Sequence, residues 1–264
     1  MVLISPRAVS RGIVLCIRLF ILFVVIREIR GSFIYPVFRL LKIRIIRRLL
    51  LRLLALIVLF HLYCLMVLVY LQSGPPLYTT VRIQRRIEAS IRQEPFAPKH
   101  RFIPLNDISP HLRHAVIAAE DGRFYQHGGI DWREVEIVVR ETMERPKNLR
   151  GASTITQQLV KNLFFTTHSN IVRKGFELTL APLTEHILSK DRILELYLNV
   201  VEWGPDIYGI EAASQHYYSI PASALTRSQA ARLAACLPAP LTRTPPQMDR
   251  YSREILSRMD ARGW

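Results

Sequence analysis

Residues Ser109 to Asp131, SPHLRHAVIAAEDGRFYQHGGID, open with a helix start signal and contain a pair of adjacent carboxylates. Ser109 followed by Pro110 is typical of an N-cap and the first position of a helix. The apolar residues that follow recur at helical spacing: Leu112, Val116 and Ala119. The pattern therefore predicts a helix that carries Glu120 and Asp121 at its C-terminal end.

A carboxylate at that end of a helix opposes the helix dipole, which raises the pKa of the carboxyl group. A raised pKa suits a general base, because such a group holds a proton during part of the reaction. We therefore interpret Glu120 as the base, and a solvated acidic helix end is the alternative. In the rest of the run, Asp121 and His127 are expected to orient neighbours by hydrogen bonds, Phe124 to pack, and Gly129 to turn the chain.

The stretch Gly151 to Asn162, GASTITQQLVKN, predicts a second helix, because Gly and Ser precede a run with apolar periodicity. Thr154, Gln158 and Lys161 fall at i, i+4 and i+7 and share one polar face. Amides, hydroxyls and a lysine near a helix N-terminus are typical of an anion site. Ordinary capping with a solvated face is the alternative.

A cationic cluster follows at Arg173 and Lys174, which lie four and three residues before Glu177. A surface salt bridge on a helix is one interpretation. The other is a pair of cations for a phosphate group, with a second carboxylate held between them. Glu120 and Glu177 would then lie in contrasting environments, one that handles a proton and one among fixed charges.

Charge divides the chain in two. Residues 1–72 hold eleven Arg or Lys and one acid, which gives +10 of the chain's +15. The cations alternate with long aliphatic residues, which favours a membrane surface over nucleic acid as the partner.

Residues Leu53 to Gln72 contain no Lys, Arg, Asp or Glu. Twenty helical residues reach about 30 Å, the thickness of the bilayer hydrocarbon. We predict a transmembrane helix here, against the alternatives of a buried core helix and a cleaved signal peptide. All the cations of this region precede the span, so the positive-inside rule places the N-terminus in the cytoplasm and the chain after Ser73 outside.

Other N-terminal features are weaker. Ile13 to Ile26 is apolar but short and interrupted by Arg18, so it is interpreted as interfacial or as a second, weak span. The three cysteines suggest neither a metal site nor a disulfide framework. The predicted domains are a basic segment at 1–52, a transmembrane helix at 53–72, a Pro-containing lead-in at 73–105 with one short helix near Thr80–Gln93, and a catalytic domain at 106–264. After the lead-in we expect helices and no run of strands.

Taken together, the motifs resemble the peptidoglycan glycosyltransferases of family 51. Five stretches carry the resemblance in order: Glu120-Asp121-x-x-Phe124-x-x-His127-x-Gly129-x-Asp131, Gly151-x-Ser153-Thr154-Ile155-Thr156-Gln157-Gln158, Arg173-Lys174-x-x-Glu177, Lys190-x-x-Ile193-Leu194-Glu195-x-Tyr197-Leu198-Asn199, and the Ala-rich run from Arg227 to Pro240. They cover roughly residues 100–245. The resemblance implies a mainly α, lysozyme-like fold of two lobes.

The resemblance also implies a reaction. A growing glycan on undecaprenyl pyrophosphate would be the donor and lipid II the acceptor, joined with inversion, with Glu120 as the base and Glu177 as the second essential carboxylate. It assigns substrate binding to ten residues: Asp121, Phe124, His127, Ser153, Thr154, Gln157, Gln158, Lys161, Arg173 and Lys174. No tightly bound cofactor and no dedicated metal site is expected, and Mg²⁺ or Mn²⁺ at the pyrophosphate is a candidate helper.

The chain carries no Ser-x-x-Lys and no Lys-Thr-Gly, so transpeptidase signatures are missing and a monofunctional polymerase is expected. A lysozyme-like hydrolase and an idle scaffold protein are the alternatives. The expected location is the bacterial inner membrane, with the catalytic domain periplasmic and other cell-wall proteins of the division or elongation machinery as candidate partners. Leu163-Phe164-Phe165 is either a membrane-facing patch or buried core. The long basic N-terminus departs from the family pattern, and an overlong start is the alternative to a genuine segment.

Overall fold

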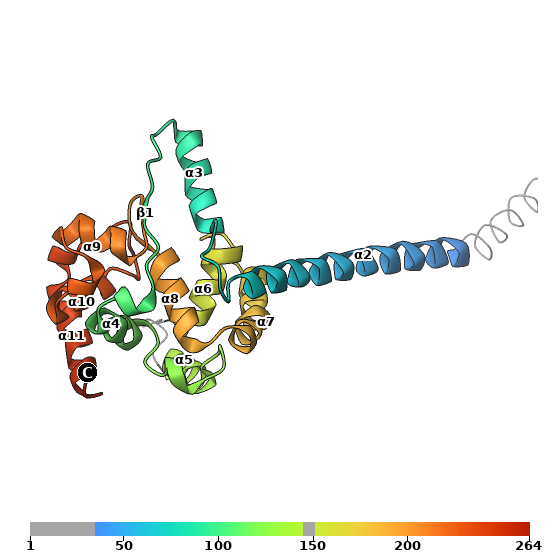
Figure 1. Ribbon diagram of the computed structural model, residues 1–264. Helices are drawn as coiled ribbons and strands as arrows, with labels where there is room; N and C mark the ends of the chain where they lie inside the picture. The colour runs from blue at the N-terminus through green and yellow to red at the C-terminus, as the bar shows by residue number, and fades with distance from the viewer. Residues whose placement is uncertain (1–34, 145–150) are drawn as a thin grey trace, which may run out of the picture. The chain divides into compact units, whose positions relative to one another are not determined.

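The computed structural model describes residues 35–144 and 151–264, with side chains from residue 43 onward (Figure 1). The predicted weak segment Ile13–Ile26 and Cys16 lie outside the described residues. Two compact units are present, residues 1–60 and 61–264. Most elements of the second unit are α-helices, which confirms the predicted mainly α fold.

Helix α2 (Tyr35–Tyr70) contains the stretch Ile43–Tyr70, which is long and apolar enough to cross a membrane. Its 28 residues reach about 42 Å, more than the roughly 30 Å of bilayer hydrocarbon. Only 11% of its most apolar window is buried, so the alternative of a soluble core helix does not hold.

The last turns of α2 belong to the second unit. Cys64, Leu68 and Leu71 are buried there. The side chain of Gln72 donates a hydrogen bond of 3.0 Å to the carbonyl of Ile187, which ends helix α7 (Ile171–Ile187). The C-terminal half of the predicted span Leu53–Gln72 is therefore partly covered by protein.

The remaining helices of the second unit are short and amphipathic. They are α3 (Thr80–Arg92), α4 (Pro110–Glu120), α5 (Trp132–Glu144), α6 (Ile155–Phe164), α8 (Lys190–Val200), α9 (Ile210–Tyr218), α10 (Arg227–Ala234) and α11 (Asp249–Asp260). Among the described residues, 3-10 turns connect them: η2 (Leu105–Asp107), η3 (Phe124–Gln126), η4 (Ala222–Ala224) and η5 (Pro245–Gln247). The predicted helices near Thr80–Gln93 and before Glu120 are confirmed, whereas α5 and α11 were not predicted.

A small sheet accompanies the helices, although the described residues contain no run of long strands. Strands β1 (Lys99–His100), β2 (Glu202–Gly204) and β3 (Ile207–Tyr208) form a sheet in the order β1-β3-β2. The pair β1 and β3 is parallel, and the pair β2 and β3 is antiparallel. Strands of two or three residues are too short for a period of two to be visible in the sequence.

Two packed groups of helices meet at the site. Helix α4 packs against α10 and α11, while α6 packs against α7 and α8 (Figure 1). The large side chains between the elements are fully buried, with Tyr197 at 0% and Trp203 at 0% exposure. Glu120 ends α4 at the point where the first group reaches α6.

Two expectations about local packing are corrected. Leu163 and Phe164 are 7% and 9% exposed, so the core interpretation of this segment is right and the membrane-facing one is wrong for these two residues. Helix α4 begins after Ser109 as predicted, but the Ser109 hydroxyl does not cap it. That hydroxyl donates instead to the carbonyl of Leu225 at 2.9 Å, which ties the start of α4 to the segment before α10.

Candidate active site

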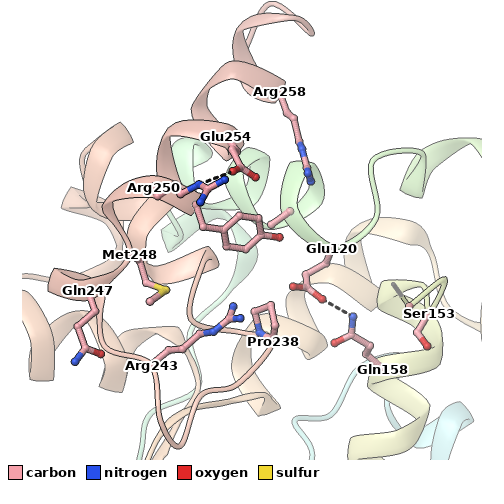
Figure 2. Close-up of a pocket in the computed structure, with 13 residues that line it drawn as sticks. Glu120, Ser153, Gln158, Pro238, Arg243, Gln247, Met248, Arg250, Glu254 and Arg258 are labelled. Atoms are coloured by element: carbon pink, nitrogen blue, oxygen red, sulfur yellow. Dashed lines mark hydrogen bonds and ion pairs between the residues drawn. The ribbon is translucent and has the colours of Figure 1, made fainter. Parts of the chain in front are cut away.

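Glu120 is the last residue of α4 and lines a cavity of about 820 Å³. Its Oε2 accepts a hydrogen bond of 2.7 Å from the side-chain amide of Gln158 on α6 (Figure 2). The amide oxygen of Gln158 in turn accepts a bond of 3.0 Å from the Tyr197 hydroxyl on α8. Since Tyr197 donates to the oxygen, the NH₂ group of Gln158 must face Glu120. Three helices therefore fix the orientation of one carboxylate.

The pKa of the Glu120 carboxyl is raised above its usual range, and burial is the largest cause. The Gln158 hydrogen bond and the positive charges of Lys161 and Arg243 oppose the rise, and the neighbouring Asp121 adds to it. The predicted direction is confirmed, but the leading cause is desolvation. A half-buried carboxyl of this kind can take up a proton more readily than an exposed one.

Asp121 has a different role from its neighbour. Both of its oxygens lie within hydrogen-bond reach of His127 Nε2, at 2.9 and 3.1 Å. Its Oδ2 also accepts a bond of 3.0 Å from the backbone N–H of Ile155, the first residue of α6. Asp121 and His127 thus orient and connect, as expected, and Asp121 fastens the N-terminus of α6 to the end of α4.

Asp121, His127 and Asp131 form a compact group whose possible ligand atoms lie within 4.8 Å of one another. Each carboxylate already has protein partners, because Asp131 accepts the Glu134 N–H at 3.0 Å and faces Arg123 at 3.6 Å. Hydrogen bonds therefore account for this group without an ion. The divalent cation expected at a substrate pyrophosphate stays a prediction.

The predicted polar face of α6 is divided by the structure. Thr154 is the N-cap of α6, and together with Gln157 it forms a capping box. The Thr154 hydroxyl accepts the Gln157 N–H at 3.1 Å and donates to the carbonyl of Gly129 at 2.6 Å. Both side chains are about 2% exposed, so their polar groups hold the chain together at this point. Of this face, Gln158 alone is among the residues that line the 820 Å³ cavity.

The cationic cluster is assembled as the spacing predicted. Arg173 Nε lies 3.0 Å from Glu177 Oε1, and Lys174 Nζ lies 3.0 Å from Glu177 Oε2. Glu177 is 3% exposed, while the side chain of Lys174 is 40% exposed. Lys174 Nζ also donates to the Ser153 hydroxyl at 2.9 Å. Because Ser153 lines the Glu120 cavity as well, it connects the two halves of the site.

Lys161 is half-buried on α6 and is influenced by both halves. Burial lowers the pKa of its ammonium group, while the charges of Glu177 and Glu120 raise it and those of Arg173 and Lys174 lower it. Its charge therefore acts on both carboxylates. Phe124, in contrast, is fully buried and lies under the ammonium of Lys190 at 4.4 Å, so the structure places it in the core and not at the cavity.

The opposite wall of the cavity was not predicted from the sequence. It is formed by the segment before α11 and by α11 itself: Arg243, Gln247, Met248, Arg250, Tyr251, Glu254 and Arg258. Figure 2 shows Arg243 and Arg258 reaching toward the space in front of Glu120. A signal existed, because Tyr251, Ile255 and Met259 recur at i, i+4 and i+8 after Pro245 and predict an amphipathic helix.

Comparisons with known proteins identify related sequences. The sequence model of one protein family, described as Transglycosylase, matches residues 87–260. A biosynthetic peptidoglycan transglycosylase of Nitrosomonas eutropha is 42% identical over 215 residues, which cover 80% of this chain and 88% of the relative. Proteins described in the same words from Rhizobium etli and Agrobacterium fabrum are each 46% identical over 162 residues, covering 61% of this chain and 69% and 71% of the relatives.

Proposed function

Because this chain belongs to the transglycosylase family and is an enzyme that polymerises the glycan of peptidoglycan, we propose a specific reaction for it. In this reaction the enzyme transfers a growing lipid-linked glycan to the GlcNAc 4-hydroxyl of lipid II. The configuration at the donor carbon inverts, and undecaprenyl pyrophosphate leaves. One observation carries this proposal. A carboxylate with a raised pKa, Glu120, shares a site with a second, buried carboxylate, Glu177, that is held by two cations.

The proposed chemical step uses Glu120 as the base. The acceptor 4-hydroxyl loses its proton to Glu120 as its oxygen forms a bond to C1 of the donor sugar, and the bond from C1 to the pyrophosphate oxygen breaks. The raised pKa brings the base closer to neutral pH, where proton transfer is most effective. Gln158 and Tyr197 hold the carboxylate in one orientation, so little reorganisation is needed at the moment of reaction.

The cations around Glu177 are proposed to stabilise the negative charge of the leaving group. A pyrophosphate departs already ionised, so stabilising its charge matters more than supplying a proton. Lys174, Lys161 and Arg173 are the cations that surround Glu177. We propose that they hold the donor pyrophosphate and that Glu177 keeps Arg173 and Lys174 in place. A retaining hydrolase instead needs an acid and a nucleophile, and a carboxylate tied to two cations suits neither role.

We propose that the acceptor binds against the cavity wall formed by α11 and the segment before it. The acceptor hydroxyl must lie between Glu120 and the donor carbon, and the cations of α7 are proposed to hold the donor. The cavity on the α11 side contains Arg243, Arg258 and Tyr251. Its volume, about 820 Å³, falls within the range of roughly 300–1,000 Å³ typical of small-molecule sites. Arginines and a tyrosine ring suit a sugar that carries a phosphate.

The full-length protein and labelled lipid II provide the test. Glu120→Gln should abolish polymer formation, and Glu136→Gln on the exposed face of α5 should leave it unchanged. Polymerisation by Glu120→Gln at the parent rate would show that Glu120 is not the base. Release of fragments from preformed glycan without use of lipid II would favour the hydrolase, and no activity of the parent on either substrate would favour the scaffold protein.

We propose further that α2 anchors the chain in the bacterial inner membrane in a single pass, with the N-terminus cytoplasmic. The support is the apolar stretch Ile43–Tyr70 together with the eleven cations that precede residue 53. An alkaline phosphatase fusion after Ser73 should be active. An inactive fusion at this position, with a cytoplasmic reporter active there, would reverse the orientation.

A further inference from the structure

One face of α3 leaves three isoleucines in solvent. Ile83, Ile87 and Ile91 recur at i, i+4 and i+8 and are 47%, 54% and 77% exposed. Residues at this spacing share one side of a helix. Helices in contact with water seldom leave such a stripe uncovered, so an exposed stripe of this kind marks an interaction surface.

Other side chains of α3 are bound to the rest of the protein. Arg85 binds both oxygens of Glu202 at 3.1 Å and Glu88 at 2.9 Å. Gln84 donates to the Thr167 hydroxyl at 2.9 Å and accepts the Thr167 N–H at 2.7 Å. The orientation of α3 is therefore fixed by these contacts, and the isoleucines are exposed as a consequence of that fixed packing.

Cations border the isoleucine stripe. Arg86 is exposed and Arg82 is half-exposed, with its guanidinium 5.6 Å from the centre of the Tyr208 ring. Within the part of the chain that the structure describes, no ion pair joins either arginine to a carboxylate, in contrast to Arg85. An apolar face bordered by arginines is typical of a helix that lies on an anionic membrane surface.

The chain keeps α3 close to the end of α2. Nine residues, 71–79, connect Tyr70 to Thr80. Arg192 donates to the carbonyls of Leu71 at 2.8 Å and Gly74 at 2.5 Å, which holds this connection against α8. Leu77 and Tyr78 within it are 69% and 74% exposed, and tyrosine is common where membrane and water meet.

From these observations we infer that the face Ile83–Ile87–Ile91 of α3 lies on the membrane, with Arg82 and Arg86 contacting anionic lipid headgroups. The inference rests on the proposed anchor. It gives the catalytic unit a second attachment besides α2, which restricts rotation of the unit about the anchor. A site held at a fixed height and orientation would meet lipid-linked substrates repeatedly in the same geometry.

The test uses the full-length chain in vesicles of phosphatidylethanolamine and phosphatidylglycerol. A fluorophore is attached at Ile87→Cys, and Ser228→Cys on the exposed side of α10 is the control. Cys16 is replaced by Ser, while Cys64 and Cys236 are buried and stay. The Ile87 label should be quenched by a nitroxide carried on lipid and protected from iodide in water, and the Ser228 label should show the reverse. Flotation of the vesicles checks separately that the chain is anchored.

The outcomes are distinct. Iodide quenching at Ile87 equal to that at Ser228, in chains that float with the vesicles, would overturn the inference and leave the anchor intact. Protection from both quenchers, reversed by dilution in detergent, would show a second copy of the chain on this face and would also overturn it. Replacing phosphatidylglycerol by phosphatidylcholine, or Arg82→Gln with Arg86→Gln, should reduce lipid quenching at Ile87. Polymerisation in detergent at the parent rate shows that the variants are folded.

Discussion

Replacement of Gln158 by methionine removes the one side-chain hydrogen bond described for Glu120 while keeping the length of the side chain. The bond of 2.7 Å stabilises the charged form of Glu120 and therefore lowers its pKa. Without it the pKa of Glu120 rises further above its usual range, because burial is then opposed only by the more distant charges of Lys161 and Arg243.

The magnitude follows from the kind of bond. A hydrogen bond to a charged group contributes about 1.5–3 kcal/mol. Since about 1.4 kcal/mol corresponds to a factor of ten, Gln158→Met should lower kcat/KM roughly ten- to hundredfold at a pH where Glu120 becomes largely protonated. The base acts in its charged form, so activity is present above its pKa and is lost as the pH falls. The loss should therefore shrink as the pH is raised.

The assay is the pH profile of kcat/KM for lipid II polymerisation, measured for the parent, Gln158→Met and Tyr197→Phe. Tyr197→Phe keeps the amide but removes the bond of 3.0 Å that orients it, so its acidic limb should move in the same direction by a smaller amount. An acidic limb that stays in place in Gln158→Met, with a uniform loss at every pH, would contradict a role of this bond in setting the pKa of Glu120. That result would indicate that Gln158 binds substrate and does not tune the base.

Three other predictions follow from the contacts. Arg173→Leu leaves the buried Glu177 with one cation fewer and should lower the free energy of unfolding by about 3 kcal/mol, measured by thermal unfolding. The double variant Arg173→Leu with Glu177→Leu should be more stable than this single variant. Equal stability of the two variants would contradict a buried ion pair. Gly129→Ala should destabilise the fold by about 1–3 kcal/mol, because φ is +90° and the added Cβ would meet a backbone carbonyl at 2.7 Å; an unchanged melting temperature would contradict this. Arg243→Gln should shift the acidic limb of kcat/KM to higher pH, since Arg243 lowers the pKa of Glu120, and an unchanged limb would place its charge too far away to matter.

Local rules explain what the sequence could predict. The helix before Glu120, the spacing of Arg173, Lys174 and Glu177, and the apolar stretch in α2 all depend on neighbours within a few residues or on composition. These features need no knowledge of distant contacts, and the structure contains each of them. Local spacing cannot decide between two equally good local solutions, as at Thr154, whose hydroxyl could cap a helix or face a ligand.

Solvent exposure was harder to predict than helix formation. Phe164 and Ile87 are both apolar residues in amphipathic helices, yet Phe164 is 9% exposed and Ile87 is 54% exposed. Periodicity shows which residues share a face, but only the packing partners decide which face is covered. The α3 stripe is exposed because the contacts of Arg85 and Gln84 fix the orientation of α3 on the protein.

The residue types of the site, the mainly α fold and the long apolar helix can be read from the sequence, because these depend on local spacing and composition. The division of the site between helices depends on long-range packing. This packing joins Glu120 to Gln158 and Tyr197 across 38 and 77 residues of chain. It also adds Arg243 from the segment before α11 and Arg258 from α11, a helix that was not predicted. Burial supplies the main cause of the raised pKa of Glu120, and burial exists only once distant helices pack around the carboxylate.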